Sequence, residues 1–434
     1  MCRYYNILLD KHKIPHNSLY YRKHPVDFVL HQNHFQDTCN QKPILLYSNY
    51  LIHQQIVHLD KKITTEKEFI NFSGEDLRRR QYLSGYSIED LELILHPMVE
   101  DAKEATGSMG DDTPVAVLSN NYRPISHYFR QNFSQVTNPP IDSLRENEVM
   151  SLKTRFGNLG NILDFENLTK DNIYVLESPI LSNSQFEKFT VFFKDSLKVL
   201  DCTFDVQTNL KKRLDQLCSE AEIAVREGCK HLILSDKKIS EKKAAIPMIL
   251  AFGAINSKLV TLGIRGFASI NVQTGEVLDT HSFAVLLGIG ATTVNPYLAF
   301  DSIYQRYEKK LFGKFNYGEC IQRYIKSVDN GLLKIMSKMG ISVLSSYRGG
   351  CNFEAVGLSR AIISEYFPGM ISRISGIGIF GIETKVKALH KKAFQKNVSI
   401  LPIGGIYKYR KNGEDHQYQG QLIHMLQHAV TTNS

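Results

Sequence analysis

Two adjacent carboxylates stand in a glycine-rich segment of the chain. Residues 107–114 read Gly-Ser-Met-Gly-Asp-Asp-Thr-Pro, so flexible glycines lie beside Asp111 and Asp112. Carboxylates of this kind can bind a metal ion or act as acid and base. Adjacent side chains rarely point the same way, however, and no third oxygen ligand stands at a suitable spacing. The segment therefore predicts a structural turn at a domain junction, and no metal site is expected.

A second candidate for chemistry is Cys2. Removal of Met1 would leave a free α-amino group next to the thiol, which is the arrangement that N-terminal nucleophile hydrolases use to attack an amide. That mechanism also needs an oxyanion hole and a substrate pocket. The weakly patterned residues that follow Cys2 offer little from which to build either. Cys2 is therefore named as a candidate nucleophile, but no catalytic role is assigned to it.

Two further sets of polar residues could take part in chemistry. Asp279, His281 and Ser282 suggest a catalytic triad, but residues this close in sequence cannot pass a proton along a line, so a polar turn is expected instead. Arg348 lies in the turn formed by residues 347–350. It is a candidate for binding an anion at the C-terminal rim of a barrel.

A glycine motif near the C-terminal end matches the pattern of dinucleotide-binding loops. Residues 376–381 read Gly-Ile-Gly-Ile-Phe-Gly. In such loops the motif follows a strand, and a ribose-binding carboxylate stands after the next strand. Residues 372–375 do not read as a strand, and no such carboxylate follows. The motif therefore predicts close packing of the backbone without a nucleotide.

The elements that must position these residues are strand-like and helix-like segments that alternate from about residue 172. Such alternation is typical of βα units around a parallel sheet. Their number and spacing favour an α/β fold of the degenerate (β/α) barrel type over an open doubly wound sheet. Strands are expected at 173–176, 198–204, 231–234, 267–272, 292–294 and 341–344, and helices at 210–227, 244–262, 298–311 and 331–339.

The domain organisation follows from changes in composition. Residues 1–75 are rich in His, Tyr, Asn, Gln and Lys and predict an irregular N-terminal extension. Ser87 is followed three residues later by Asp90, a pattern that begins a helix. We expect one domain over 76–434, with a turn-rich first part at 76–171 and the βα units at 172–434.

Composition and charge exclude several classes of partner. The 52 Lys and Arg against 44 Asp and Glu give a net charge of +8, spread along the chain without a basic run interleaved with aromatics, so no nucleic acid is expected. The seven cysteines show no paired metal-ligand spacing and indicate free thiols in a reducing compartment. The longest apolar run, at 244–255, is far shorter than the roughly 20 residues that span a bilayer. A cytoplasmic protein without a membrane partner is expected.

Several tracts together resemble the central domain of glutamate synthase large chains, the family that moves the amide nitrogen of glutamine to 2-oxoglutarate. The match is long and specific, and its tracts follow the order of the family. They are Gly-Ser-Met-Gly-Asp-Asp at 107–112, Gln-Val-Thr-Asn-Pro-Pro-Ile-Asp at 135–142, Leu-Ser-Asp at 234–236, Val-Asn-Pro-Tyr-Leu-Ala at 294–299, Ser-Tyr-Arg-Gly at 346–349 and Phe-Glu-Ala-Val-Gly-Leu at 353–358.

The resemblance implies an architecture and a role for the glycine-rich loop. Large chains of this family begin with an N-terminal-cysteine glutaminase domain, followed by this barrel-like connector, an FMN barrel with an iron-sulfur cluster, and a β-helix. We expect this chain to be truncated before the flavin barrel, to hold no cofactor itself, and to have separate glutaminase and FMN-domain chains as partners. The residues implied at a domain junction or on the ammonia path are Ser108, Met109, Gly110, Asp111 and Asp112.

Three hypotheses for function follow, and they leave open whether the chain is an enzyme by itself. The first is a non-catalytic connector or partial subunit in glutamate biosynthesis and ammonia assimilation, within a family of oxidoreductases acting on CH-NH2 donors. It predicts exposed apolar patches where other domains dock. The second is a stand-alone barrel enzyme of unknown substrate with Arg348 or Asp236 as working groups, which predicts a deep polar pocket. The third is a non-functional relic.

Overall fold

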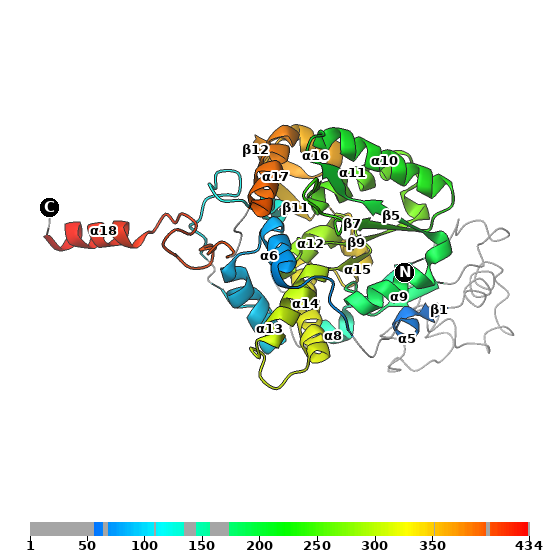
Figure 1. The fold of residues 1–434 in the computed structure, drawn as a ribbon, viewed down its shortest axis with the longest axis horizontal. Helices are drawn as coiled ribbons and strands as arrows, with labels where there is room; N and C mark the ends of the chain where they lie inside the picture. Colours follow the sequence, from blue (N-terminus) through cyan, green and yellow to red (C-terminus); the bar gives the residue numbers. More distant parts are fainter. Residues whose placement is uncertain are drawn as a thin grey trace, which may run out of the picture.

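The computed structural model describes residues 56–63, 68–107, 110–133, 145–156, 173–350, 352–395 and 400–432 (Figure 1). Three candidates from the sequence therefore lie outside the described residues, namely Cys2, Ser108 and Met109. The same holds for most of the predicted N-terminal extension and for the tract at 135–142. The boundary expected at residue 75 stays a prediction.

A parallel sheet of four strands lies at the centre of the fold. Its strands are β5 (Leu197–Asp201), β7 (His231–Ser235), β9 (Ser269–Gln273) and β10 (Thr293–Asn295). Their spatial order is β10-β9-β7-β5, and His231 pairs with both Leu197 and Ser269. All five residues of β7 are buried, as expected for a strand covered on both faces. These apolar runs are the ones that the sequence predicted as strands.

The strands neighbour one another in the order in which they occur along the chain. A helix follows each of the first three, namely α10 (Leu210–Arg226), α11 (Met248–Thr261) and α12 (Thr280–Gly288). Sequential order is typical of (β/α) barrels, whereas doubly wound sheets reverse their order at a switch point. The α/β class with a parallel sheet is thus confirmed. No pairing within the described ranges closes these strands into a ring.

Two long helices show why the sequence folds as it does. Helix α14 (Tyr317–Met339) begins at a capping box in which Asn316 and Glu319 exchange hydrogen bonds, and it ends at Gly340, whose φ of 71° is readily adopted by glycine. Helix α11 is buried over most of its length because it packs against α10, α12 and α16 (Arg360–Tyr366). In Figure 1, α10, α11 and α16 lie above the sheet, with α14 below it.

Smaller elements surround this centre. Three short sheets are formed by β1 (Ile56–His58), β4 (Ile173–Leu176) and β3 (Thr154–Phe156), by β12 (Ile371–Ile377), β11 (Phe353–Leu358) and β2 (Phe129–Gln131), and by β6 (Thr203–Asp205) and β8 (Lys243–Ala245). The other α-helices are α5 (Leu59–Lys62), α6 (Gly74–Leu83), α7 (His96–Glu100), α8 (Glu146–Val149), α9 (Asn183–Phe192), α13 (Tyr297–Glu308), α15 (Leu344–Tyr347), α17 (Ile379–Phe394) and α18 (Gly420–Thr432). No helix in the described ranges is long and apolar enough to cross a membrane.

Three local predictions can be compared with the structure. The strand expected at 341–344 is wrong, because Val343 makes only a single bridge to Ser151 before α15 begins. The interpretation of 372–375 as non-strand is also wrong, because β12 pairs with β11 there. The close backbone packing expected from the glycine motif is confirmed, since a Cβ on Gly376 would lie 2.2 Å from the carbonyl oxygen of Gly357.

Candidate functional site

A pocket of about 320 Å³ lies at the C-terminal edge of the parallel sheet. Glu276 and Asp279, which follow β9, form part of its wall, together with Asp90 and the loop around Arg123 and His127. In α/β folds, ligands bind at this edge, beyond the carboxyl ends of the strands. The pocket is therefore a candidate ligand-binding site.

Burial shifts the pKa values of Glu276, Asp90 and His127 in this pocket. Burial, reinforced by the charge of Asp236, raises the pKa of Glu276 to about 8, although its carboxylate accepts a hydrogen bond from the backbone N–H of Met248. Burial also raises the pKa of Asp90 to about 6 and lowers that of His127 to about 4. At neutral pH Glu276 is thus largely a neutral acid and His127 a neutral imidazole. Such groups can exchange protons with a bound molecule.

Asp236 lies beneath this pocket rather than on its surface. It follows β7, is only 1% exposed, and accepts hydrogen bonds from Thr274 Oγ1 (2.5 Å), Tyr297 Oη (2.9 Å) and the N–H of Gly275 (3.1 Å). Burial, as the largest cause, raises the pKa of this carboxyl. Asp236 follows β7, while its donors lie after β9 and β10, so these hydrogen bonds link the loops that follow the three strands. Asp236 therefore positions these loops and is not a working group on the pocket surface.

The segment 400–418, here called the strap, forms another part of the pocket wall and leads to α18. Its first anchor is Glu89, whose carboxylate accepts hydrogen bonds from three consecutive backbone N–H groups. They belong to Ile406 (2.6 Å), Tyr407 (3.2 Å) and Lys408 (3.0 Å). Several N–H donors around one carboxylate make a strong, charge-assisted contact. This contact links residues more than 300 positions apart.

The paired aspartates of the glycine-rich loop have different partners. Asp111 accepts hydrogen bonds from the N–H and the hydroxyl of Thr113 and so closes its own turn. Asp112 instead binds the strap, through His416 Nδ1 at 2.8 Å and the N–H of Tyr418 at 3.0 Å. The two side chains thus do not converge on one metal ion. The implied place of this loop at a domain junction or on an ammonia path stays a prediction.

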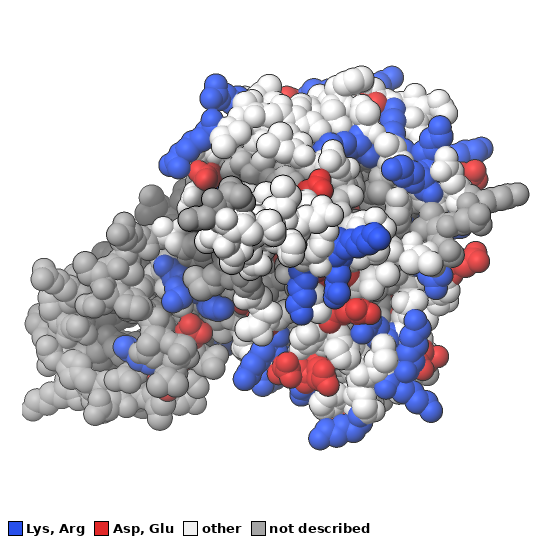
Figure 2. Space-filling model, turned by 90° about the vertical axis from the view of Figure 1, so that its left-hand side faces the viewer, with Lys and Arg blue, Asp and Glu red and all other residues white. Residues whose placement is uncertain are grey.

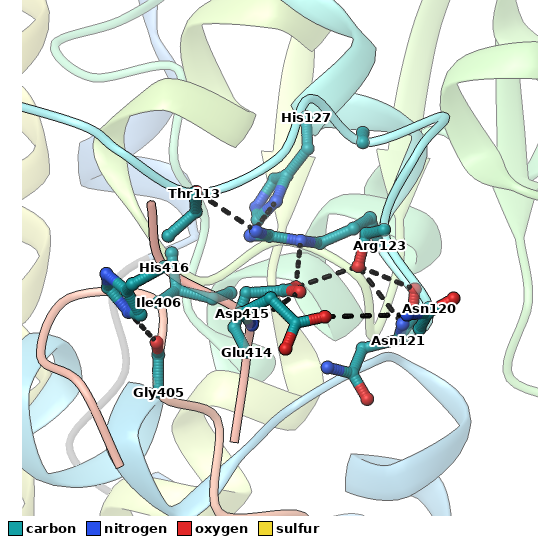
Figure 3. A network of polar contacts seen from close by, with 12 residues as sticks. Thr113, Asn120, Asn121, Arg123, His127, Gly405, Ile406, Glu414, Asp415 and His416 are labelled. Carbon is teal, nitrogen blue, oxygen red and sulfur yellow. Dashed lines mark hydrogen bonds and ion pairs between the residues drawn. The ribbon is translucent and has the colours of Figure 1, made fainter. Parts of the chain in front are cut away.

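His416 contacts an acceptor with each ring nitrogen. Nε2 lies 2.6 Å from the carbonyl oxygen of Gly405 (Figure 3), while Nδ1 lies 2.8 Å from the Asp112 carboxylate. Because a carbonyl and a carboxylate accept hydrogen bonds only, this arrangement suits the doubly protonated ring. Burial works against the charged form, but these two hydrogen bonds outweigh it and raise the pKa of His416.

A buried ion pair completes the attachment of the strap. Arg123 Nε lies 3.0 Å from Glu414 Oε2, in an ion pair without hydrogen-bond geometry, and their side chains are 5% and 1% exposed. Ser119 donates its hydroxyl to the same carboxylate at 2.8 Å. Thr113 accepts a hydrogen bond from Arg123 Nη2 (Figure 3). Sequence analysis missed this network because its members are far apart in the chain and no local pattern joins them.

The position predicted for Arg348 is wrong. Its Nη2 donates to the carbonyl of Thr292, the residue before β10, and to Thr154 Oγ1. The next residue, Gly349, donates its N–H to Gly288 at the end of α12. Arg348 therefore lies at the N-terminal edge of the sheet, opposite the rim where it was expected. The short helix α15 turns the chain here in place of the predicted strand. Binding of an anion by Arg348 stays a prediction.

The expected polar turn at Asp279 is confirmed. Asp279 caps α12 by accepting from the N–H of Ser282, whose hydroxyl donates back to the Asp279 carbonyl. His281 contacts the carbonyl of Ser126 instead. These three residues thus form a helix cap and not a triad. In the part of the chain that the structure describes, no three His, Cys, Asp or Glu side chains gather to hold a metal ion.

A protein-family model matches most of the body of the chain. The model of the glutamate synthase central domain covers residues 79–359, a range that holds the parallel sheet, Glu276 and Arg123 but not Glu414 of the strap. A solved structure of mutant flavocytochrome b2 is similar at a TM-score of 0.34 and 10% identity, over 64% of this chain and 90% of the other. That likeness is too weak to support an argument.

Glutamate synthases from several organisms resemble this chain over most of its length. The chain is 53% identical to the NADPH glutamate synthase large chain of Azospirillum brasilense over 88% of its own length, and 38% identical to that of Bacillus subtilis over 87%. It is also 38% identical to the chloroplastic ferredoxin-dependent enzyme of rice, over 84%. The chain spans only about a quarter of these relatives, 26%, 24% and 24% respectively. The chain therefore belongs to the glutamate synthase central domain family.

Proposed function

We propose that this chain is the connecting part of a glutamate synthase, without an active site of its own. In this proposal it joins a glutaminase region to an FMN-binding region, which supply ammonia and the reducing centre. FMN and the iron-sulfur cluster belong to those partner regions, and the assembly works in the cytoplasm. Family membership and the share of the relatives that the chain spans support this role.

The observation on which the proposal depends is the exposed apolar face of α18. The helix projects away from the body at the C-terminal end (red in Figure 1). Leu422, Met425, Leu426 and Val430 recur at helical spacing and are 52–72% exposed. No Lys, Arg, Asp or Glu occurs in residues 420–432. An uncharged helix with an open apolar face needs a partner surface to cover it.

The body offers a second apolar area. Ile371 and Ile374 on β12 and Phe380 at the start of α17 are each more than half exposed. In Figure 2, which shows the side to which α18 projects, Lys and Arg side chains lie around a central uncharged area, as expected for a view toward the end of the uncharged α18. Apolar areas rimmed by charges are typical of docking surfaces between domains. Both areas thus support a chain that works in contact with further domains.

Reconstitution tests the connector proposal. The chain would be mixed with separately produced glutaminase and FMN-binding regions of a glutamate synthase large chain, and glutamine-dependent glutamate formation from 2-oxoglutarate would be followed. We expect no product from the chain alone, product from the full mixture, and binding weakened by about tenfold or more in the double variant Leu422→Glu/Leu426→Glu. Lys334→Glu, on an exposed helix face, is the matched control. Absence of any binding would contradict the proposal.

A stand-alone enzyme is the second candidate, and the pocket at the C-terminal edge favours it. Glu276, held largely protonated at neutral pH, can serve there as a general acid. If this candidate is right, the chain without partners turns over a substrate, and Glu276→Gln abolishes turnover while leaving the fold intact. Activity that arises only in the reconstituted mixture and survives Glu276→Gln would exclude it.

A further inference from the structure

A second and larger cavity, of about 890 Å³, lies at the opposite edge of the parallel sheet. Its wall includes the residues that precede the strands, such as Ser196 before β5, Lys230 before β7, Ala268 before β9 and Thr292 before β10. Arg348 and Gly349 close one side of it. This cavity shares no lining residue with the pocket at the C-terminal edge.

The described lining of this cavity is positively charged. It includes Arg155, Lys230, Arg265 and Arg348 but no Asp or Glu. His231 also faces it and shares a hydrogen bond of 2.8 Å with Ser269. Burial, followed by the charge of Lys230, lowers the pKa of His231 to about 4, so this ring is neutral at physiological pH. The positive charge therefore comes from the arginines and the lysine.

Arg265 has only neutral partners. It donates to Asn256 Oδ1 at 2.6 Å and to the carbonyls of Ala268 and Gly290 at 2.7 and 3.0 Å. These contacts fix the guanidinium in place but supply no negative charge. A buried cation without a counter-charge costs free energy. Burial accordingly lowers the pKa of Arg265 to about 10, which still leaves it charged at neutral pH.

Arg348 is the less satisfied of the two arginines. Its Nη2 donates to Thr154 Oγ1 and to the carbonyl of Thr292, both neutral. Its Nε is buried and has no hydrogen-bond partner among the described residues. Burial and the nearby Arg265 lower its pKa to about 10. Within the described ranges, no ion pair joins a carboxylate to either guanidinium.

We propose that this cavity is a binding site for a small anion that carries two or more carboxylate or phosphate groups. A guanidinium presents parallel N–H donors that match the two oxygens of such a group, and the buried Nε of Arg348 has no partner in the described part of the chain. Lys230 and Arg155, both exposed, add charge at the rim that attracts an anion from solution. The aromatic rings of Phe156, Tyr174 and Phe193 line the cavity as well and suit the carbon body of the ligand.

Titration calorimetry on the whole chain tests the site, with citrate and pyrophosphate as the polycarboxylate and phosphate probes. Sodium acetate and sodium chloride at matched ionic strength are the controls. We expect saturable binding of one molecule of citrate, of pyrophosphate or of both, and none of acetate. The stronger probe identifies which of the two groups the site prefers. The proposal is overturned if neither citrate nor pyrophosphate binds saturably. It is also overturned if sodium chloride gives the same binding heat as the probes.

Substitutions in the cavity test whether the anion binds there. Arg348→Gln should weaken the binding of the stronger probe by about tenfold or more. Arg348→Lys keeps the positive charge but loses the parallel N–H donors of the guanidinium, so it should weaken binding less. Arg373→Gln, at an exposed position on β12, is the matched control and should bind like the parent chain. If Arg348→Gln fails to fold, the rim variant Arg155→Gln/Lys230→Gln replaces it, with a loss of affinity expected. Unchanged affinity in the folded variants overturns the proposal.

Discussion

At the scale of single residues, the Arg123–Glu414 pair is the contact whose loss should cost most. Both side chains are buried, so removing one charge leaves the other in a dry environment without a partner. We expect Glu414→Gln to destabilise the chain by about 3–5 kcal/mol, the range found for broken buried pairs. Urea unfolding would measure it.

An exposed ion pair provides the matched control for Glu414→Gln. Arg373 lies 3.5 Å from Glu354, and the two side chains are 77% and 22% exposed, so water reaches the pair through the arginine. Pairs at the surface contribute about 0–1 kcal/mol because water screens their attraction. Glu354→Gln should therefore leave the unfolding midpoint nearly unchanged. Equal losses in the two variants would show that Glu414 is not buried in solution as the structure has it.

The contact between Asp112 and His416 predicts how pH acts on the strap. The pKa of His416 is raised in the folded chain, so its contribution is complete below the ordinary value of 6.5 and is lost as pH rises through the raised pKa. Asp112 behaves in the opposite sense. The N–H of Tyr418, followed by His416, lowers its pKa, so its contribution is complete above 3.8 and is lost as pH falls through the lowered pKa.

We therefore expect the strap to be held best between about pH 4 and 6.5 and to loosen above neutral pH. Hydrogen-exchange protection factors of the Gln417 and Tyr418 amides, which bond to Asp112, report this directly. In His416→Gln the loss of protection above neutral pH should disappear. A parent chain whose protection stays constant as pH rises would contradict the assignment of a charged His416.

Gly376 offers a test of backbone packing. A Cβ at this position would lie 2.2 Å from the carbonyl oxygen of Gly357, so β11 and β12 would have to move apart. We expect Gly376→Ala to cost about 1–3 kcal/mol, the usual range for overpacking. Thermal unfolding would measure it against Gly420→Ala, where an added Cβ meets no atom within 4 Å. A loss no larger than in that control would contradict the close packing.

At the scale of elements, α18 buries none of its residues against the body. Its 13 residues are all at least partly exposed. Isolated helices shorter than about 12–15 residues are marginal in water, so α18 should fray in the chain alone. We expect fast amide exchange over 421–432 in the isolated chain and slow exchange after docking, with α14 slow in both. Fast amide exchange over 421–432 in the docked state would show that α18 is not part of the docking surface.

Local signals allowed some elements to be predicted, and their absence explains the misses. Ser87 and Asp90 exchange hydrogen bonds as the sequence indicated, because a capping box needs only four consecutive residues. The strand β12 was missed because Ile-Ser-Arg-Ile-Ser-Gly-Ile mixes polar residues and glycine into a mostly exposed edge. Only its pairing with β11 makes it a strand.

At the scale of the whole molecule, the two cavities lie at opposite ends of the same parallel strands. Arg348 faces one and Glu414 the other. Effects of distant substitutions add within about 0.3–0.5 kcal/mol when they share no partner. We expect the double variant Arg348→Gln/Glu414→Gln to lose the sum of the two single losses in free energy of unfolding. A larger deviation would show that the sheet couples its two edges.

The α/β class could be predicted from the sequence, whereas the candidate site largely could not. Apolar runs such as the one at β7 identify buried strands because their hydrophobicity is local. The strap contacts join Glu89, Asp112 and Arg123 to residues about 300 positions away, and no spacing rule reaches that far. Arg348 was placed at the wrong edge because the predicted strand before it proved to be a single bridge.

The way in which Glu89 holds the strap has a consequence for how this family can change over evolutionary time. Its carboxylate binds the backbone amides of Ile406, Tyr407 and Lys408 and none of their side chains. These three positions are therefore free to exchange one amino acid for another without loosening the anchor. Proline is the exception, since it has no N–H to donate. Sequence drift at 406–408 should thus be wide but proline-free, while Glu89 itself stays constant.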